Sequence, residues 1–171
     1  TPNSDLIRPV PPTRSIPWQT WVLAIWALGA AVLIARLGLG LWRVSAAVRQ
    51  AQTVTDPRWL RHLDRALARL SCRRKVRLLV TDQVEIPATV GVFRPAILLP
   101  VRAATWLDDR RQAVLLHELV HVARFDWPAR MIARITRAAY WFNPLAWWAV
   151  RRLDLEQELA CDEEVLALGT G

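Results

Sequence analysis

The stretch AVLLHELVHVARFD, residues 113–126, contains two histidines four residues apart, His117 and His121, with Glu118 directly after the first. Its apolar residues recur at helical spacing, and residues four apart on a helix share a face. Both imidazoles can then bind one zinc ion at about 2.0–2.1 Å. Glu118 would project beside the ion, where its carboxylate can take a proton from zinc-bound water. The five-residue pattern alone is common by chance, so this interpretation depends on a third ligand.

The stretch EQELACDEE, residues 156–164, offers that ligand, because Glu158 and Asp162 are four apart and share a helix face. Glu158 completes a set of two histidines and one glutamate that leaves a position open for water. Asp162 can accept the N–H of a zinc-bound histidine and fix its tautomer. Without the histidine pair, these acids would be interpreted as a solvated helix face. Cys161 could approach the ion, but a free cysteine is usually a small buried apolar residue, so it is not assigned as a ligand.

Residues 18–35 carry no charge, and the apolar character continues past Arg36 to Trp42. About 25 residues give a helix of about 37 Å, enough to cross a bilayer with some tilt. The tryptophans at its two ends resemble an interfacial aromatic belt. The alternative, a buried helix of a soluble protein, is seldom apolar on every face. We therefore expect one transmembrane helix over residues 18–42, with the Arg36 side chain reaching the headgroups.

Basic residues follow this segment far more often than they precede it. Residues 1–17 hold two arginines, whereas residues 43–75 hold nine lysines and arginines. The positive-inside rule predicts that residues 1–17 form an external tail and that residues 43–171 form a cytoplasmic domain. The net charge of +8 would also suit nucleic acid, but no nucleic-acid-binding signature accompanies it. Two cysteines in unlike contexts fit a reducing compartment rather than a disulfide framework.

The region after the span is expected to be α+β and mainly helical. Asp56 and Pro57 provide an N-cap and a first helical position for an amphipathic helix, with His62 on its polar face. Residues 75–100 indicate two or three short strands, the last being AILLP at 96–100, whose edge could receive an extended substrate.

The remaining part of this region indicates three helices and the corner that joins the last two. Thr105 and Asp108 resemble a capping box at the start of the histidine helix. Two further helices are expected at 127–141 and from Pro144 onward. The uncharged run 138–150 is too short to span a membrane and is expected to be an interfacial or core corner.

The blocks GVFRPAILLP, HELVHVARFD, WFNPLAWWAVRRL and ELACDEEVL, in this order, resemble the BlaR/MecR-type family of membrane-embedded zinc peptidases. The resemblance runs from Trp18 to the C-terminus. It implies a gluzincin-like fold, with a histidine helix, a small sheet and a second ligand helix. It also implies a bacterial inner membrane location, several membrane spans in the full-length form, a following sensor region and a role in antibiotic resistance signalling. The chain, which begins at Thr1, is accordingly expected to be a C-terminally truncated fragment.

The resemblance assigns roles to individual residues. It implies Zn²⁺ as cofactor and Glu118 as general base, and the residues that would bind or surround the ion are His117, His121 and Glu158 as ligands, Asp162 as their partner, and Arg124 and Asp126 in structural or supporting ion pairs. Family members are similar in cleaving themselves and a cytoplasmic repressor. We therefore expect a membrane-anchored endopeptidase acting on such substrates, with no direct contact to nucleic acid and with homodimerisation left open.

Two other interpretations compete with this one. The first is a non-catalytic transducer whose zinc is structural, although structural zinc usually has four protein ligands. The second is a membrane protease of the CAAX-processing or heat-shock type, which shares the HExxH and ExxxD elements but not the WFNP and ACD blocks. Neither Tyr140 nor any arginine is singled out by spacing as an oxyanion stabiliser, so that role stays unassigned.

Overall fold

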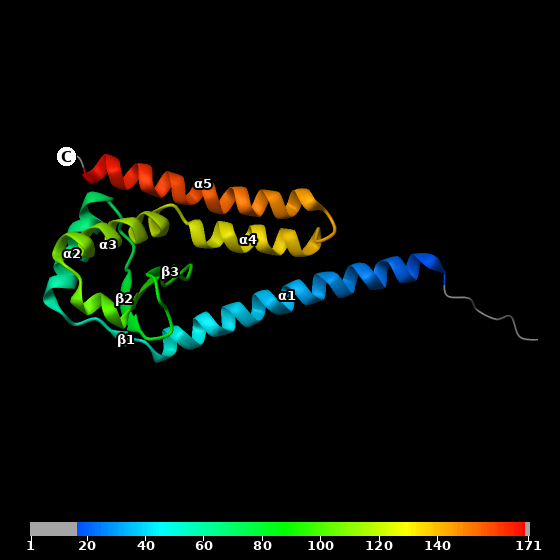
Figure 1. The fold of residues 1–171 in the computed structure, drawn as a ribbon, viewed down its shortest axis with the longest axis horizontal. Coiled ribbons are helices and arrows are strands. Elements are labelled where there is room, and N and C mark those ends of the chain that lie inside the picture. Colours follow the sequence, from blue (N-terminus) through cyan, green and yellow to red (C-terminus); the bar gives the residue numbers. More distant parts are fainter. Residues whose placement is uncertain (1–16, 170–171) are drawn as a thin grey trace, which may run out of the picture.

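The computed structural model describes residues 17–169, so the expected external tail at 1–17 lies outside them except for Pro17. Helices dominate this part of the chain, and one small sheet lies among them (Figure 1). The expected α+β, mainly helical fold is confirmed. The sheet lies between a layer formed by the helices α2 (Pro57–Arg69) and α3 (Asp108–Ala123) and a second layer to which α1 (Trp18–Gln50) contributes.

Helix α1 covers Trp18–Gln50, so it continues past Trp42, where the apolar stretch ends. It is the one helix in residues 17–169 that is long and apolar enough to cross a membrane, and none of its most apolar window is buried against the protein. Its C-terminal part behaves differently, because Val44 and Val48 pack on the sheet. A single helix thus joins an unburied apolar segment to the folded domain.

Helix α2, Pro57–Arg69, begins as expected, since the Asp56 carboxylate accepts a hydrogen bond from the Arg58 backbone N–H. The expectation that His62 is solvated is wrong. His62 is buried with Trp59 and Leu63, and its Nε2 lies 3.6 Å from Asp108 Oδ1. The Trp59 ring packs on Trp106, so the core-facing side of the helix includes Trp59 and His62 as well as Leu63.

The sheet has strand order β1-β2-β4-β3, with β1 at Gln52–Thr53, β2 at Arg77–Thr81, β3 at Ala88–Val90 and β4 at Ala96–Pro100. Strand β4 pairs in parallel with β2 and antiparallel with β3. The expectation that AILLP offers an edge is therefore wrong. All five of its residues are buried, because Ile97 and Leu99 pack toward α2 and α3 while Ala96 and Leu98 pack toward α1. The two edge strands are β1 and β3, and β3 is the one in contact with α3.

Three helices follow the sheet: α3 at Asp108–Ala123, α4 at Asp126–Ala139 and α5 at Pro144–Gly169. The expected capping box is absent, because Thr105 belongs to the 3-10 helix η1, Val101–Thr105, and its hydroxyl donates to the Arg102 carbonyl. Phe125, with a left-handed φ of 59°, makes the sharp turn between α3 and α4. Helix α5 then returns alongside both α4 and α3 (Figure 1).

Candidate metal centre

Helices α3 and α5 pack against each other and bring the two sequence motifs together. Leu115 and Leu119 on one face of α3 are fully buried in the core, so the opposite face carries His117 and His121 toward α5. The two imidazoles are one turn apart and meet edge to face, with ring centroids 4.9 Å apart. Glu158 on α5 lies opposite both rings.

The ligand atoms have the spacing that a tetrahedral zinc ion requires. Glu158 Oε2 lies 3.5 Å from His117 Nε2 and 3.7 Å from His121 Nε2. Bonds of 2.0–2.1 Å at tetrahedral angles separate neighbouring ligand atoms by about 3.3 Å. Both histidines also present the same nitrogen, Nε2, to one carboxylate oxygen. The three residues could therefore hold one ion with only small adjustments.

A carboxylate lies close to the Nδ1 atom of each histidine. His121 Nδ1 lies 2.7 Å from Asp126 Oδ2, and His117 Nδ1 lies 3.3 Å from Asp162 Oδ1. A carboxylate on Nδ1 holds the proton there and leaves Nε2 free to bind a metal. Asp126 is buried, whereas the Asp162 side chain is 67% exposed. Arg124 Nε lies 3.7 Å from Asp126 Oδ1, so Arg124 pairs with the carboxylate that contacts His121.

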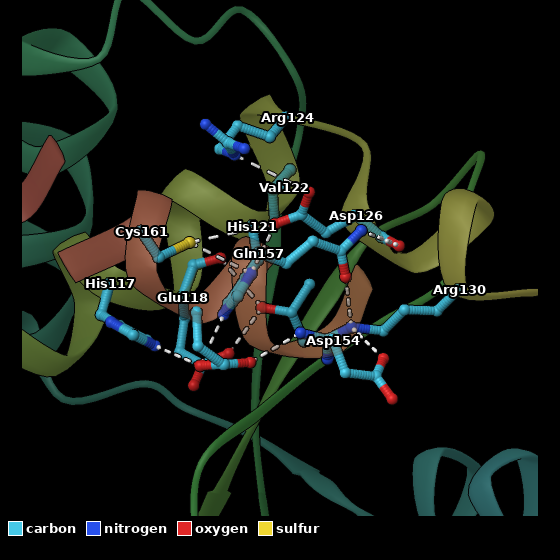
Figure 2. A network of polar contacts seen from close by, with 12 residues as sticks. His117, Glu118, His121, Val122, Arg124, Asp126, Arg130, Asp154, Gln157 and Cys161 are labelled. Carbon is cyan, nitrogen blue, oxygen red and sulfur yellow. Dashed lines mark hydrogen bonds and ion pairs between the residues drawn. The ribbon is translucent and has the colours of Figure 1, made fainter. Parts of the chain in front are cut away.

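Cys161 belongs to a second buried group with His121 and Asp126 (Figure 2). Its Sγ lies 3.1 Å from His121 Nδ1, but that nitrogen already makes the 2.7 Å hydrogen bond to Asp126. This separation is shorter than the edge of about 3.6 Å expected for a sulfur and a nitrogen ligand of one zinc ion, because the zinc–sulfur bond is about 2.3 Å long. Burial, together with the negative charge of Asp126, raises the pKa of the Cys161 thiol to about 12. The arrangement fits a buried thiol beside a hydrogen-bonded pair better than a metal ligand.

Glu118 lines a cavity of about 440 Å³ that opens onto both histidines and Glu158. The Glu118 carboxylate is buried, and its Oε2 lies 2.8 Å from the Thr89 hydroxyl on the edge strand β3. The same hydroxyl lies 2.9 Å from the Glu118 backbone oxygen, and its single proton can serve one of the two at a time. Thr89 thus ties Glu118 to the sheet edge. No spacing signal in the sequence pointed to Thr89.

Arg130 is a further residue that the sequence did not single out. It lies on α4, one turn after Asp126, and lines the same cavity. Its guanidinium donates to Glu158 Oε1 at 2.6 Å and to Gln157 Oε1 at 2.7 Å. Arg130 therefore holds the Glu158 oxygen that does not face the histidines. Tyr140, by contrast, lies at the far end of α4 and does not line the cavity.

Comparisons with known proteins extend over almost the whole chain. The model of the family described as BlaR1 peptidase M56 matches residues 8–170. The regulatory protein BlaR1 of Bacillus licheniformis is 31% identical over 143 residues, which are 84% of this chain and 24% of that protein. The methicillin resistance mecR1 protein of Staphylococcus aureus is 24% identical over 97 residues, 56% of this chain and 17% of that protein. The chain thus spans about a quarter or less of the length of these relatives.

Proposed function

The chain belongs to the BlaR1 peptidase M56 family, and on that premise we propose that it is the membrane-anchored zinc endopeptidase unit of a signal-transducing protein. One observation carries the proposal. Two histidine nitrogens converge on one oxygen of Glu158, and a second buried carboxylate, Glu118, lines the same open cavity. This is the arrangement that a gluzincin-type peptidase requires, with His117, His121 and Glu158 as zinc ligands.

In this proposal Glu118 is the general base. When bound, zinc supplies a Lewis acid that polarises the scissile carbonyl and lowers the pKa of a water ligand to about 7. Glu118 accepts the proton of the attacking water and later delivers it to the leaving amine. Thr89, 2.8 Å from Oε2, fixes the carboxylate and leaves Oε1 to handle the proton. Arg130 binds Glu158 Oε1, which would leave Oε2, the oxygen nearer the histidines, available to a metal ion.

The substrate is proposed to add to β3 as a further strand. Strand β3 pairs with β4 on one side only, and Ala88 and Thr89 line the cavity beside Glu118. An extended peptide can pair its backbone with such an edge, which brings a peptide bond to the site with little dependence on sequence. The sequence suggested β4 as the strand that receives the substrate. Because β4 lies inside the sheet, we propose β3 for this role instead.

The same residues argue against a purely structural metal. A structural zinc ion usually has four protein ligands, whereas three converge here and the fourth direction faces a cavity. A structural site would also not need Glu118. This residue is not one of the three ligands, and its carboxylate accepts a hydrogen bond from Thr89. These observations favour catalysis over the non-catalytic transducer.

The topology and the substrates complete the proposal. Residues 18–42 would span a bacterial inner membrane, residues 1–17 would lie outside, and residues 43–171 would form the peptidase domain, which is cytoplasmic except where it contacts the membrane. The substrates would be the full-length protein itself and a cytoplasmic repressor. The family membership supports a protein substrate and an association with the membrane.

The test is the Glu118→Gln variant. It is close to isosteric, and its amide oxygen can still accept from Thr89, so zinc and fold should be retained while the proton acceptor is lost. We expect cleavage of the full-length protein or of its repressor to fall by about 10²–10⁴-fold. Glu156→Gln, on an exposed face of α5, is the matched control and should cleave at the wild-type rate. Wild-type cleavage by a zinc-loaded Glu118→Gln protein would overturn the peptidase mechanism.

A further inference from the structure

Helix α4 runs antiparallel along α1, well into the apolar part of that helix. The Trp26 indole donates to the Ala139 carbonyl at 2.9 Å, and the Trp141 indole donates to the Trp26 carbonyl at 3.1 Å. At Gly29 the contact is so close that a Cβ would lie 2.2 Å from the Trp141 ring. At the other end of the contact, Trp127 packs with the C-terminal part of α1.

This packing sets the depth of the turn between α4 and α5. Trp26 and Gly29 lie inside the charge-free segment 18–35, so the turn that contacts them enters the bilayer whenever α1 spans it. The turn suits such a place, because residues 138–150 carry no charge and its large apolar side chains are exposed, namely Tyr140, Phe142, Leu145 and Trp148. The charges that flank it, Arg137 and Arg151, would then lie nearer the headgroups.

A basic pocket lies at the point where this turn meets α1. Its volume is about 310 Å³, and it is lined by three arginines, two leucines and one tryptophan, which are Arg36, Arg134, Arg137, Leu33, Leu37 and Trp147. Arg134 and Arg137 are three apart on α4 and so share a face. The lining contains no acidic residue.

The charges of this pocket have no anionic partner in residues 17–169. None of the three arginines has a carboxylate within the 4.0 Å of an ion pair in that part of the chain. The Arg137 guanidinium lies 4.7 Å from the centre of the Trp147 ring, and its Nε is buried with no hydrogen-bond acceptor. Like charges gathered beside apolar side chains repel one another, and a buried donor without an acceptor is costly. A bound anion would reduce the repulsion between the arginines and give the buried donor an acceptor.

The position of Arg36 indicates which anion. Arg36 follows Trp18 by a length of about 27 Å at 1.5 Å per residue, close to the bilayer core thickness of about 30 Å. The pocket would therefore lie at the headgroup level of the leaflet that faces the peptidase domain. Leu33 and Leu37 lie on the membrane side of Arg36 or next to it, so an acyl chain can run along them.

We propose that α1, α4 and α5 form a binding site for the phosphate of an anionic phospholipid. The arginines would bind the phosphate, and the leucines would contact the acyl chains. Guanidinium groups bind phosphate through paired, charge-assisted hydrogen bonds. The site rests on the proposed span by α1 but not on peptidase activity. A bound lipid would hold α4, and with it Arg130 and Asp126, in place against α1.

The experiment measures lipid binding to the purified protein in a nonionic detergent by native mass spectrometry. Short-chain phosphatidylglycerol is titrated against phosphatidylcholine and inorganic phosphate. We expect Arg134→Gln/Arg137→Gln to bind phosphatidylglycerol roughly 30-fold more weakly, since each arginine near an anionic surface contributes a factor of about five. Arg58→Gln/Arg61→Gln removes the same charge from the exposed face of α2 and should bind within about twofold of the wild type.

Three outcomes would overturn the site. They are equal binding of phosphatidylglycerol by the wild type and by the folded Arg134→Gln/Arg137→Gln variant, equal binding of phosphatidylcholine, and displacement of the lipid by inorganic phosphate at equal concentration. Zinc content reports folding of each variant. If the double variant does not fold, Arg36→Gln, on an exposed position of α1, carries the test with an expected loss of about fivefold. Loss of cleavage in Glu118→Gln addresses the peptidase separately, because lipid binding is measured without substrate.

Discussion

The two carboxylates that contact the Nδ1 atoms of the histidines make a matched pair, because they perform the same task in different surroundings. Asp126 lies 2.7 Å from His121 Nδ1 with its side chain 6% exposed, and Asp162 lies 3.3 Å from His117 Nδ1 with its side chain 67% exposed. We compare Asp126→Asn with Asp162→Asn. Each substitution removes one negative charge and keeps an oxygen that can accept the histidine proton.

The expected magnitudes follow from burial. Removing a carboxylate behind a metal-binding histidine typically lowers metal affinity by about 10–100-fold, and Asp126→Asn should fall in this range. A neutral hydrogen bond is roughly half as strong as a charged one, and Arg124 also loses its partner. The exposed Asp162 contact is screened by water and salt, and exposed ion pairs contribute about 0.2–1 kcal/mol. Asp162→Asn should therefore lower zinc affinity by no more than about fivefold.

Zinc affinity is measured by competition with a chromophoric chelator, and circular dichroism reports whether each apo variant keeps its helices. The comparison uses the ratio of the two variants, so errors in the chelator constant cancel. An equal loss in both, or a larger loss in Asp162→Asn, would refute the argument that burial decides which carboxylate orients the site. Unchanged affinity in Asp126→Asn would show that the 2.7 Å contact does not hold His121 for the metal.

Two further predictions concern the metal and the membrane. His121→Ala and Glu158→Ala should each lower the zinc content of the purified protein below one ion per chain by elemental analysis, and full zinc retention in Glu158→Ala would remove that residue from the site. In a background lacking the native cysteines, an impermeant thiol reagent should label Ser4→Cys but not Ser45→Cys in intact cells, and the reverse pattern would place the peptidase domain outside.

Features that depend on residues close together along the chain could be predicted from the sequence. The spacing of His117 and His121 needs only the helical period, and Asp56 with Pro57 predicts the start of α2, which the structure confirms. The charge-free segment 18–35 predicts a long apolar helix, and α1 contains it. The pairing of Glu158 with the histidines came from the resemblance as much as from spacing, because the two motifs lie on different helices.

Features that depend on which surfaces meet could not be predicted in the same way. By sequence, His62 lies among arginines on the polar face of its helix. In the structure it is buried, because the packing of Trp59 on Trp106 brings this side of the helix to the core. The apolar strand at 96–100 gave no sign of whether it would be central or at an edge. A continuous apolar run indicates only that both faces are covered, and strand order depends on long-range pairing.

The sequence by itself determined the α+β class, the apolar helix and the family, because helical periods and long apolar runs are local properties of the chain. Only the tertiary structure decided that β3 is the edge beside Glu118, that Arg130 holds Glu158, and that the α4–α5 turn meets α1 at Gly29. Each of these contacts joins residues far apart in sequence. Their formation depends on how whole helices and strands bury their apolar faces together, and no local pattern records that choice.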